Sequence, residues 1–423
     1  MLSLFSESKS PDDVFTPRES RVNPKMYIER PELESRLTAL LRGKLNIIIH
    51  GESGSGKSWL YKKVLSDLGA TVMPLNLANA SRLGSISAEC ANAVARTGAT
   101  TLTGYTEKKS ATASVGVLEG GVEHEKEFQT GVAEPFEACC ALARRNAGKA
   151  PAVIVLDNLE SIFEDDKLMR ELANIITLLD DERYADYAVK LLIVGVPTGV
   201  RDYFSKTPNQ ATIANRLTEL PEIGRLTSEQ ARQLVHRGFI DELRYTVDKD
   251  SLRTVEDHVL WVTDRIPQRL HEYCLDLAQV GRTDRKLTTD MLTIADTRWI
   301  ESSLSFNYQA IETLMNERDT KVGRRNQTLY VLGQMRDPEF RYSDVEAAIR
   351  NHFPESTTGV SMDVSTLLAH LAEAKTPILR RTPKGDSYQF RDPRFRMCIR
   401  VMLQKENATV KKVYIDTLSQ RPD

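Results

Sequence analysis

The 423-residue sequence has no long apolar segment and no strong net charge. Its longest apolar runs, such as residues 152–156, are far too short to span a bilayer. The first seven residues lack the basic end and the sustained apolar stretch of a secretory signal. With a formal net charge of −2, the chain lacks the overall positive charge that is typical of many nucleic-acid-binding proteins. These absences predict a cytoplasmic protein without a membrane contact, and they leave local basic patches open.

The sequence also has few cysteines, and they show no metal-ligand spacing. The five cysteines are odd in number and scattered along the chain. We therefore expect buried thiols in a reducing cytoplasm. The hydrophobic content of 41% and the charged content of 27% are ordinary for a globular protein. A chain of 423 residues exceeds one ordinary core, so its length predicts two or three domains.

The most informative segment runs from Gly51 to Ser58 and fits the pattern G-x-x-x-x-G-K-[ST]. An apolar run at 45–49 precedes it and a helix-compatible stretch at 59–65 follows it, as a phosphate-binding loop requires. Glycines let the backbone N–H groups approach phosphate oxygens, and a helix N-terminus adds positive potential. We expect Lys57 to neutralise the β- and γ-phosphates of ATP and the Ser58 hydroxyl to bind Mg²⁺. The other predicted nucleotide contacts here are Gly51, Ser53, Gly54, Ser55, Gly56 and Trp59. The alternative is a glycine-rich turn with a chance lysine.

Strand and helix patterns alternate after this loop, which predicts an α/β fold with a parallel sheet. Residues 152–157 and 190–195 are continuous apolar runs, typical of strands that are buried on both faces. From Thr227 onward the pattern is helical, and two short strands at 378–382 and 387–390 follow the last helices. This order predicts a flexible N-terminal tail at 1–23 and a P-loop core at 24–225, with a hairpin or mobile insert at about 100–130. An all-helical lid at 226–300 and a winged-helix domain at 301–405 follow, and the chain is expected to end in a tail at 406–423. An α+β element that completes the lid is the alternative to the winged helix.

Asp157 ends the apolar strand at 152–157, where a carboxylate can hold Mg²⁺ across from the P-loop serine. Hydrolysis also needs a group that orients or deprotonates water, commonly a glutamate beside this aspartate, but Asn158 stands there. Glu160 lies two residues further on and would reach the same side if the chain stays extended. A solvated carboxylate is the alternative for Glu160. The sequence therefore predicts ATP binding and a slow ATPase activity.

Together these motifs resemble the AAA+ superfamily of P-loop ATPases, in the branch that contains origin-recognition initiators, transposition-regulator ATPases and STAND-type signalling ATPases. The loop at 51–58 and the strand at 153–157 carry the resemblance, together with residues 191–194 and the segment Tyr27-Ile28-Glu29-Arg30-Pro31. The resemblance implies that Tyr27 and Ile28 border the adenine. Where the family usually has a polar sensor after 191–194, this chain has Gly195-Val196-Pro197.

The resemblance also implies two arginines that contact nucleotide. Arg216 lies in the stretch at 213–221 and would act as an arginine finger toward the γ-phosphate of a neighbouring subunit. A helix-end arginine paired with Glu219 or with an aspartate is the alternative. Residues 262–271 are similar to the sensor-2 segment of the lid, although the usual glycine is missing. Arg265 or Arg269 would contact the nucleotide in this segment, and we predict Arg269.

Basic residues gather near the C-terminus, against few carboxylates. They are Arg380, Arg381, Lys384, Arg391, Arg394, Arg396, Arg400 and Lys405. With Tyr388 and Phe390 nearby, this cluster could contact the phosphates of DNA, or it could dock on the acidic flank of the core or on a partner.

Two hypotheses follow. The first is an oligomeric, nucleotide-dependent switch that regulates a protein effector encoded nearby, as STAND-type ATPases do in bacterial antiviral defence. The alternative is a DNA-binding AAA+ ATPase of the origin-recognition or transposition-targeting type. The near-neutral charge favours the switch.

Overall fold

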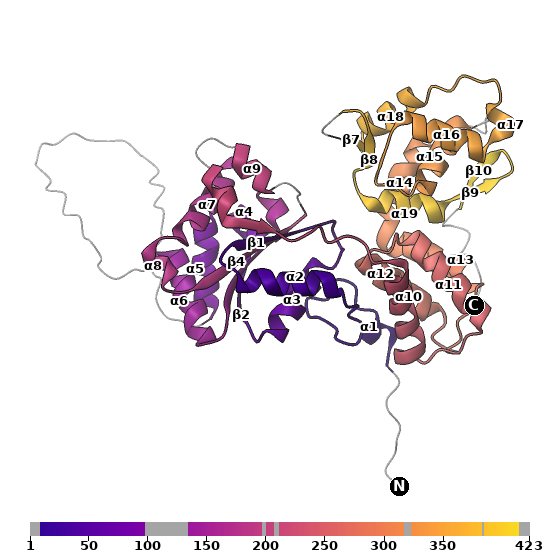
Figure 1. Ribbon diagram of the computed structural model, residues 1–423. Helices are drawn as coiled ribbons and strands as arrows, with labels where there is room; N and C mark the ends of the chain where they lie inside the picture. The colour runs from indigo at the N-terminus through magenta and orange to yellow at the C-terminus, as the bar shows by residue number, and fades with distance from the viewer. Residues whose placement is uncertain are drawn as a thin grey trace, which may run out of the picture. The chain divides into compact units, whose positions relative to one another are not determined.

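The computed structural model describes residues 9–97, 134–196, 200–206, 211–316, 323–382 and 385–413. The chain divides into two compact units (Figure 1). The first is Glu29–Gly224, which we call the P-loop unit; the second combines Met1–Ile28 with Arg225–Asp423, and we call it the C-terminal unit. Each unit has its own apolar core.

A five-stranded parallel sheet forms the centre of the P-loop unit, in the order β2-β3-β4-β1-β5. Its strands are β1 (Asn46–His50), β2 (Thr71–Asn76), β3 (Ala152–Asp157), β4 (Val189–Gly195) and β5 (Leu217–Glu219). Strand β4 separates β1, which leads into the P-loop, from β3, which ends at Asp157. Because the carboxyl ends of parallel strands meet at one edge of a sheet, the P-loop and Asp157 lie at the same edge.

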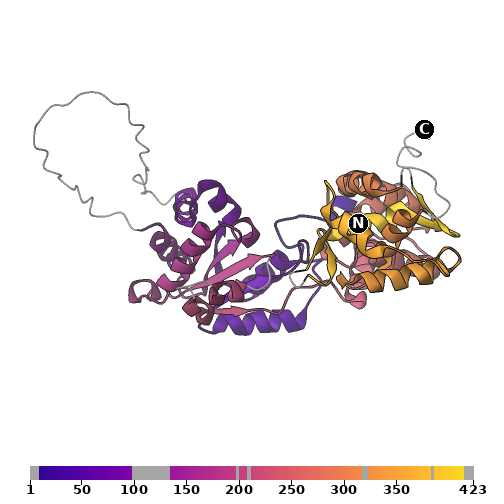
Figure 2. The ribbon, with the colours of Figure 1, turned by 90° about the horizontal axis from the view of Figure 1, so that it is seen from above.

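Helices cover both faces of this sheet (Figure 2). Ile47 and Ile49 of β1 face the core formed with α2 and α3, whereas Ile48 faces the opposite core. This alternation follows from the period of two in a strand, and it explains why the strands read as continuous apolar runs. The helices are α2 (Pro31–Arg42), α3 (Lys57–Asp67), α4 (Leu77–Leu83), α5 (Ile86–Arg96), α6 (Pro135–Ala147), α7 (Asp166–Leu178), α8 (Glu182–Ala185) and α9 (Val200–Lys206), with 3-10 turns η1 (Leu159–Ser161) and η2 (Ala211–Arg216).

The C-terminal unit begins, after the short helix α1 (Pro11–Val14), with a helical lid. Thr227 and Gln230 form the capping box that starts α10, because the Thr227 hydroxyl accepts from the Gln230 N–H. The lid consists of α10 (Ser228–His236), the π-helical turn η3 (Arg237–Glu242), α11 (Lys249–Val262), α12 (Pro267–Val280), α13 (Met291–Trp299) and the π-helical turn η4 (Ile300–Leu304).

The remainder of this unit has the helices and the antiparallel sheet of a winged-helix module. Its helices are α14 (Ser305–Leu314), α15 (Arg324–Gln334), α16 (Tyr342–His352), α17 (Pro354–Thr357), α18 (Val364–Glu373) and α19 (Pro393–Met402). Its three-stranded sheet has the order β6-β8-β7, formed by β6 (Glu339–Phe340), β7 (Leu379–Arg381) and β8 (Tyr388–Phe390). The predicted fold class is thus confirmed: a P-loop core with a parallel sheet, a helical lid and a winged helix. Strand β6 was missed because a strand of two residues has no periodicity to detect.

The N-terminal segment differs from the prediction of a loose tail. Among its described residues, Val14 and Phe15 are buried, and Phe15 is 0% exposed. The Phe15 ring lies 5.1 Å from the Phe239 ring, and a Cβ atom at Gly238 would come within 2.2 Å of it. The Thr16 N–H donates to Nδ1 of His271 at 3.1 Å. The polar, proline-containing composition of this segment predicted a loose tail, but a single aromatic side chain, Phe15, packs into the lid.

Two further boundaries were predicted differently. The predicted tail at 406–423 starts inside a hairpin, because β9 (Leu403–Glu406) pairs antiparallel with β10 (Thr409–Lys412). The lid and the winged helix, predicted as separate domains, share one apolar core and one compact unit. The predicted insert at about 100–130 lies outside the described residues, as do residues 414–423.

All five cysteines are free thiols in buried positions, as expected. Within the described ranges, no helix has both the length and the apolar character that crossing a membrane demands.

We predict that Phe15→Ala lowers the free energy of unfolding of the C-terminal unit by about 3–5 kcal/mol, the usual cost of truncating a buried phenylalanine. Urea denaturation of the full chain, followed by tryptophan fluorescence, measures this effect. Phe306→Ala in the same unit is the control, because Phe306 is 64% exposed, and we expect it to change stability by less than about 0.5 kcal/mol. Equal urea midpoints for the Phe15 variant and the unsubstituted protein would show that the N-terminal segment is not docked.

Candidate nucleotide site

The P-loop occupies the turn between β1 and α3, at the edge of the sheet where the parallel strands end. Gly51, Gly54 and Gly56 have φ values of 151°, 83° and 93°, a region that favours glycine. At Gly51 a side chain would also collide with the neighbouring backbone, because a Cβ atom there would lie 2.4 Å from the Ile223 carbonyl oxygen. The loop conformation therefore depends on glycine at these positions.

Lys57 begins α3, and its amine lies within the loop. Its Nζ donates to the carbonyl oxygens of Gly51 at 2.8 Å and Glu52 at 2.9 Å. Burial lowers the pKa of Lys57, and the charges of Glu160 and Asp157 oppose this lowering. In a nucleotide complex, phosphate oxygens would replace the two carbonyl oxygens as acceptors for this amine.

Two further features of the loop fit a phosphate ligand. The hydroxyl of Ser55 is buried and has no hydrogen-bond partner among the described residues. Such an orphaned group costs roughly 1–3 kcal/mol, which a phosphate oxygen would recover. Arg30 holds the loop from outside, because its guanidinium donates to the carbonyl oxygen of Ser55 at 2.8 Å and to that of Gly224 at 3.2 Å. Arg30 was not predicted, since no local pattern reports a contact across 25 residues.

Asp157 lies beside the first turns of α3. Its Oδ2 accepts from the Tyr61 hydroxyl at 3.2 Å, and its Oδ1 accepts from the Asn158 N–H at 2.9 Å. Burial and the negative charge of Asp157 raise the pKa of Tyr61. Because residues three apart share a helix face, Ser58 lies one turn before Tyr61 on the side toward Asp157. The structure thus brings the two predicted Mg²⁺ ligands, Ser58 and Asp157, to one place.

Asn158 has a structural contact next to Asp157. Its backbone is left-handed with φ 66°, a conformation that asparagine tolerates better than most residues. Its side-chain amide donates to Oδ1 of Asn76, at the end of β2, over 3.0 Å. An amide cannot accept a proton from water in the way a carboxylate can. At the position after Asp157, where a catalytic glutamate is common, Asn158 therefore forms a hydrogen bond that links the ends of β3 and β2.

The carboxylate of Glu160, a residue of the 3-10 turn η1, lies beside the end of β4, where the family resemblance implied a polar sensor. Its Oε2 accepts from the Val196 N–H at 3.1 Å. A Cβ atom at Gly195 would come within 2.6 Å of the Leu159 Cβ and 3.1 Å of the Glu160 carboxylate, so a side chain does not fit there. The negative charge of Glu160 opposes the lowering of the Lys57 pKa by burial. Its catalytic role stays a prediction.

Arg216 forms an ion pair within the chain. Its Nε lies 2.5 Å from Oδ2 of Asp180, and its Nη1 donates to the carbonyl oxygen of Thr212 at 3.0 Å. This is the pairing with an aspartate that we considered as the alternative. The Asp180 side chain is 56% exposed, and pairs of this kind contribute only about 0–1 kcal/mol. Arg216 can therefore leave Asp180 at little cost, and the arginine-finger role stays a prediction.

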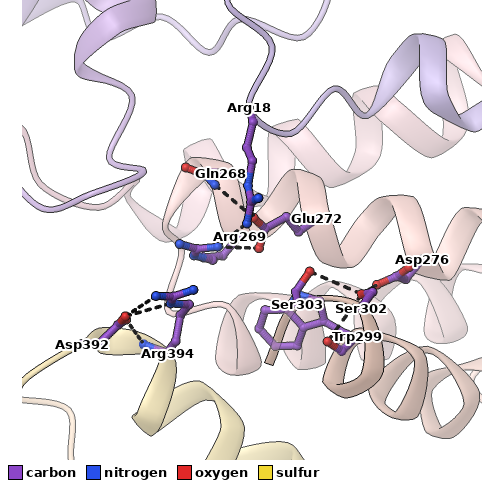
Figure 3. Close-up of polar contacts among 10 residues, drawn as sticks. All are labelled: Arg18, Gln268, Arg269, Glu272, Asp276, Trp299, Ser302, Ser303, Asp392 and Arg394. Carbon is purple, nitrogen blue, oxygen red and sulfur yellow. Dashed lines mark hydrogen bonds and ion pairs between the residues drawn. The ribbon is translucent and has the colours of Figure 1, made fainter. Parts of the chain in front are cut away.

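Arg269 belongs to the C-terminal unit and has a buried partner (Figure 3). Its Nη1 lies 2.7 Å from both carboxylate oxygens of Glu272, and its side chain is 8% exposed. Gln268 also donates to Glu272, and Arg18 approaches the same carboxylate at 3.6 Å. This network accounts for the position of Arg269 without a nucleotide, and its sensor-2 role stays untested.

The other predicted nucleotide contacts, Tyr27, Ile28, Ser53 and Trp59, differ in their burial. Tyr27 and Ile28 are buried in the C-terminal unit, where Arg237 donates to the Tyr27 carbonyl oxygen at 2.8 Å. Their role as adenine contacts stays a prediction. Ser53 is exposed on the loop, and Trp59 is half-buried on α3.

The predicted basic cluster of the winged helix divides into buried and exposed members. Arg396 and Arg400 are buried against Asp264, so the prediction that they belong to a basic surface is wrong. Arg394 pairs with Asp392 (Figure 3), and Lys405 donates to the His352 carbonyl oxygen. The exposed members are Arg380, Arg381, Arg391 and Lys405, whereas Lys384 lies outside the described residues. A smaller basic surface on and beside β7 remains.

Residues 40–204 match the family model described as an AAA domain. No curated protein matches this chain. Similar solved structures include the Walker-type ATPase of Pyrococcus abyssi, with 13% identity over 90% of this chain and 99% of that chain and a TM-score of 0.48. The ORC2 protein of Aeropyrum pernix has 15% identity over 93% of this chain and 97% of that chain, with a TM-score of 0.49. The ORC1 protein of the same organism, in complex with DNA, has 16% identity over 92% of this chain and 95% of that chain, with a TM-score of 0.45. Likenesses this low say nothing about what this chain binds.

We predict that Glu160→Gln lowers ATP turnover by about 10²-fold or more, the usual contribution of a general base, while ATP affinity is retained. Glutamine keeps an acceptor for the Val196 N–H, so the local fold should persist. Phosphate release and equilibrium ATP binding measure the two effects. Glu164→Gln, an exposed carboxylate in the same loop, is the control and should leave turnover unchanged. Turnover by the Glu160 variant at the unsubstituted rate would exclude this residue as the base.

Proposed function

We propose that this chain, whose residues 40–204 match the AAA domain family, binds ATP with Mg²⁺ at the P-loop and hydrolyses it slowly. We further propose that the bound nucleotide controls the binding of its winged-helix module to duplex DNA. The observation that supports the first part is the meeting of Lys57, Ser58 and Asp157 at one edge of the sheet.

In this proposal each residue at the sheet edge has a distinct task. Lys57 binds the β- and γ-phosphates, and the Ser55 hydroxyl and the loop N–H groups complete the phosphate contacts. Ser58 and Asp157 hold Mg²⁺, which supplies neutralisation of phosphate charge when it is bound. Glu160 orients or deprotonates the attacking water from its place beside the Val196 N–H. Turnover is slow because this carboxylate is exposed and because Asn158 cannot share the task.

The DNA part of the proposal is supported by Arg380, Arg381 and Arg391, which are exposed on and beside the strand β7 of the wing. Exposed arginines on a winged-helix module offer contacts to phosphate that carry no sequence information by themselves. The other hypothesis, a switch that regulates a protein effector in antiviral defence, has no observation in the described residues that favours it over DNA binding.

We predict that Arg216→Ala abolishes ATP-dependent assembly of the chain and lowers turnover by about 10³-fold or more, as loss of an arginine finger does. Sedimentation and phosphate release with and without ATP measure both. Asp180→Ala is the matched control, because it breaks the same intrachain ion pair and leaves the arginine in place. If both substitutions have the same effect, Arg216 serves only that ion pair and the finger is excluded.

We predict that Arg380→Ala with Arg381→Ala weakens duplex DNA binding and lowers the slope of log affinity against log salt by about 0.9 for each phosphate that is no longer neutralised. Fluorescence anisotropy with labelled duplex DNA, with ATP present, measures this at several salt concentrations. Arg325→Ala, an exposed arginine on α15, is the control, and Lys57→Ala should remove the effect of ATP. DNA binding that is absent at low salt, or that is insensitive to the two wing arginines, contradicts the DNA part of the proposal.

A further inference from the structure

The chain crosses from one compact unit to the other at two places. The first crossing follows Ile28 and the second follows Gly224. Any change in the P-loop unit that reaches the C-terminal unit through the backbone therefore passes one of these crossings. Beside them, within the P-loop unit, lie Arg30, directly before α2, and residues 220–224, which we call the exit segment.

The exit segment is packed against β1 and the start of the P-loop. Leu220 and Ile223 are both 0% exposed and belong to the apolar core that β1 forms with α3. Their backbone N–H groups donate to the carbonyl oxygens of Ile48 and His50 in β1, each at 2.9 Å. A side chain on Gly51 would collide with the Ile223 carbonyl oxygen. The first residue of the P-loop and the exit segment therefore lie directly against each other.

Arg30 joins the exit segment to the other end of the P-loop. Its Nη1 donates to the Gly224 carbonyl oxygen at 3.2 Å, and its Nη2 donates to the Ser55 carbonyl oxygen at 2.8 Å. The backbone N–H of Arg30 donates to the Glu34 carboxylate at 2.7 Å, and the proline that follows Arg30 restricts its conformation. The guanidinium is thus held in place beside one crossing, and it binds both the residue before the other crossing and the loop.

Lys57 is the residue whose contacts change when phosphate binds. Its amine donates to the Gly51 and Glu52 carbonyl oxygens, and phosphate oxygens would replace them as acceptors. Burial lowers the pKa of Lys57, and the charge of Glu222 in the exit segment is among those that oppose this lowering. Because Gly51 lies against Ile223, the change in the Gly51 contact occurs where the loop touches the exit segment.

We propose that Arg30 is a positioning residue that couples nucleotide occupancy of the P-loop to the two chain crossings. A bound phosphate fixes the peptides of Gly51 and Ser55, and Arg30 holds the exit segment against them. Nucleotide binding therefore keeps residues 220–224 and the start of α2 in one arrangement. A guanidinium suits this task because its planar fork donates from separate nitrogens to two carbonyl oxygens, whereas an ammonium is a single point of charge. This inference rests on the proposed binding of ATP at the P-loop.

Hydrogen–deuterium exchange of the full-length protein, read by mass spectrometry for peptides that cover residues 220–224, tests this coupling. The hydrogen-bonded amides of Leu220 and Ile223 report on the exit segment, and the probe is a non-hydrolysable ATP analogue with Mg²⁺. We expect the analogue to slow their exchange by about tenfold or more in the unsubstituted protein, the order expected for charged hydrogen bonds that resist local opening. In Arg30→Gln we expect faster exchange without the analogue and a slowing by less than about twofold with it.

Two further variants separate the coupling from charge and from general stability. Arg30→Lys keeps the positive charge but not the fork, and we expect it to leave the coupling broken. Arg36→Gln removes an exposed arginine from α2 and is the matched control, which should behave as the unsubstituted protein does. Exchange of the amides in the central strand β3, read in the same experiment, shows that each variant is folded.

Calorimetry measures the affinity for the analogue separately, so that two failures can be distinguished. If the unsubstituted protein binds the analogue but exchange in residues 220–224 does not slow, the coupling is wrong while the proposed function stands. The same conclusion follows if Arg30→Gln or Arg30→Lys keeps the full effect of the analogue. If the unsubstituted protein binds no analogue, the proposed ATP site is wrong and this inference fails with it.

Discussion

The C-terminal unit depends on a single buried carboxylate, Asp264. Its arginine partners come from distant parts of the chain: Arg225 directly precedes the lid, and Arg396 and Arg400 lie on α19. Burial raises the pKa of Asp264, but the three arginines outweigh this effect and hold that pKa below its usual value. Arg400 also stacks 3.8 Å from the Trp261 ring centre and donates to the Gly333 carbonyl oxygen. Removal of one partner from such a cluster leaves buried charge unpaired, which is strongly destabilising.

This cluster has a mechanical consequence for the lid. The segment after the P-loop unit, the lid helices and α19 are bound to the same carboxylate, and they share one apolar core. Close-packed elements of this kind move together because interiors resist small deformations. The lid and the winged-helix module are therefore expected to move as one body. The N-terminal segment moves with the same body, since Phe15 is buried among lid residues. Such coupling needs no flexible joint between lid and winged helix.

The parts of the structure that were predicted well from the sequence are those formed by residues close together in the sequence. The P-loop, Asp157 and the strands on both sides of them follow from short patterns, because a loop, a strand end and a helix start use neighbouring residues. The contacts that escaped prediction join residues far apart. Arg30 reaches Ser55, and Arg396 reaches Asp264 across 132 positions. A sequence states the charge of Arg396 but not its burial, and therefore a buried ion pair was predicted as part of a surface.

Two features of the candidate nucleotide site, Gly195 at the end of β4 and the Glu160 carboxylate beside it, have one physical cause. Asn158 takes a left-handed turn immediately after β3, and this turn sends Leu159 against the end of β4. Gly195 is required there because any side chain would meet Leu159 and the Glu160 carboxylate. A side chain at position 195 and a turn of this shape after β3 are therefore mutually exclusive. Because Gly195 has no side chain, the Glu160 carboxylate fits beside it and accepts a hydrogen bond from the Val196 N–H. Gly195 and the position of Glu160 thus belong to one local arrangement, in which a carboxylate from the loop after β3 lies beside the end of β4.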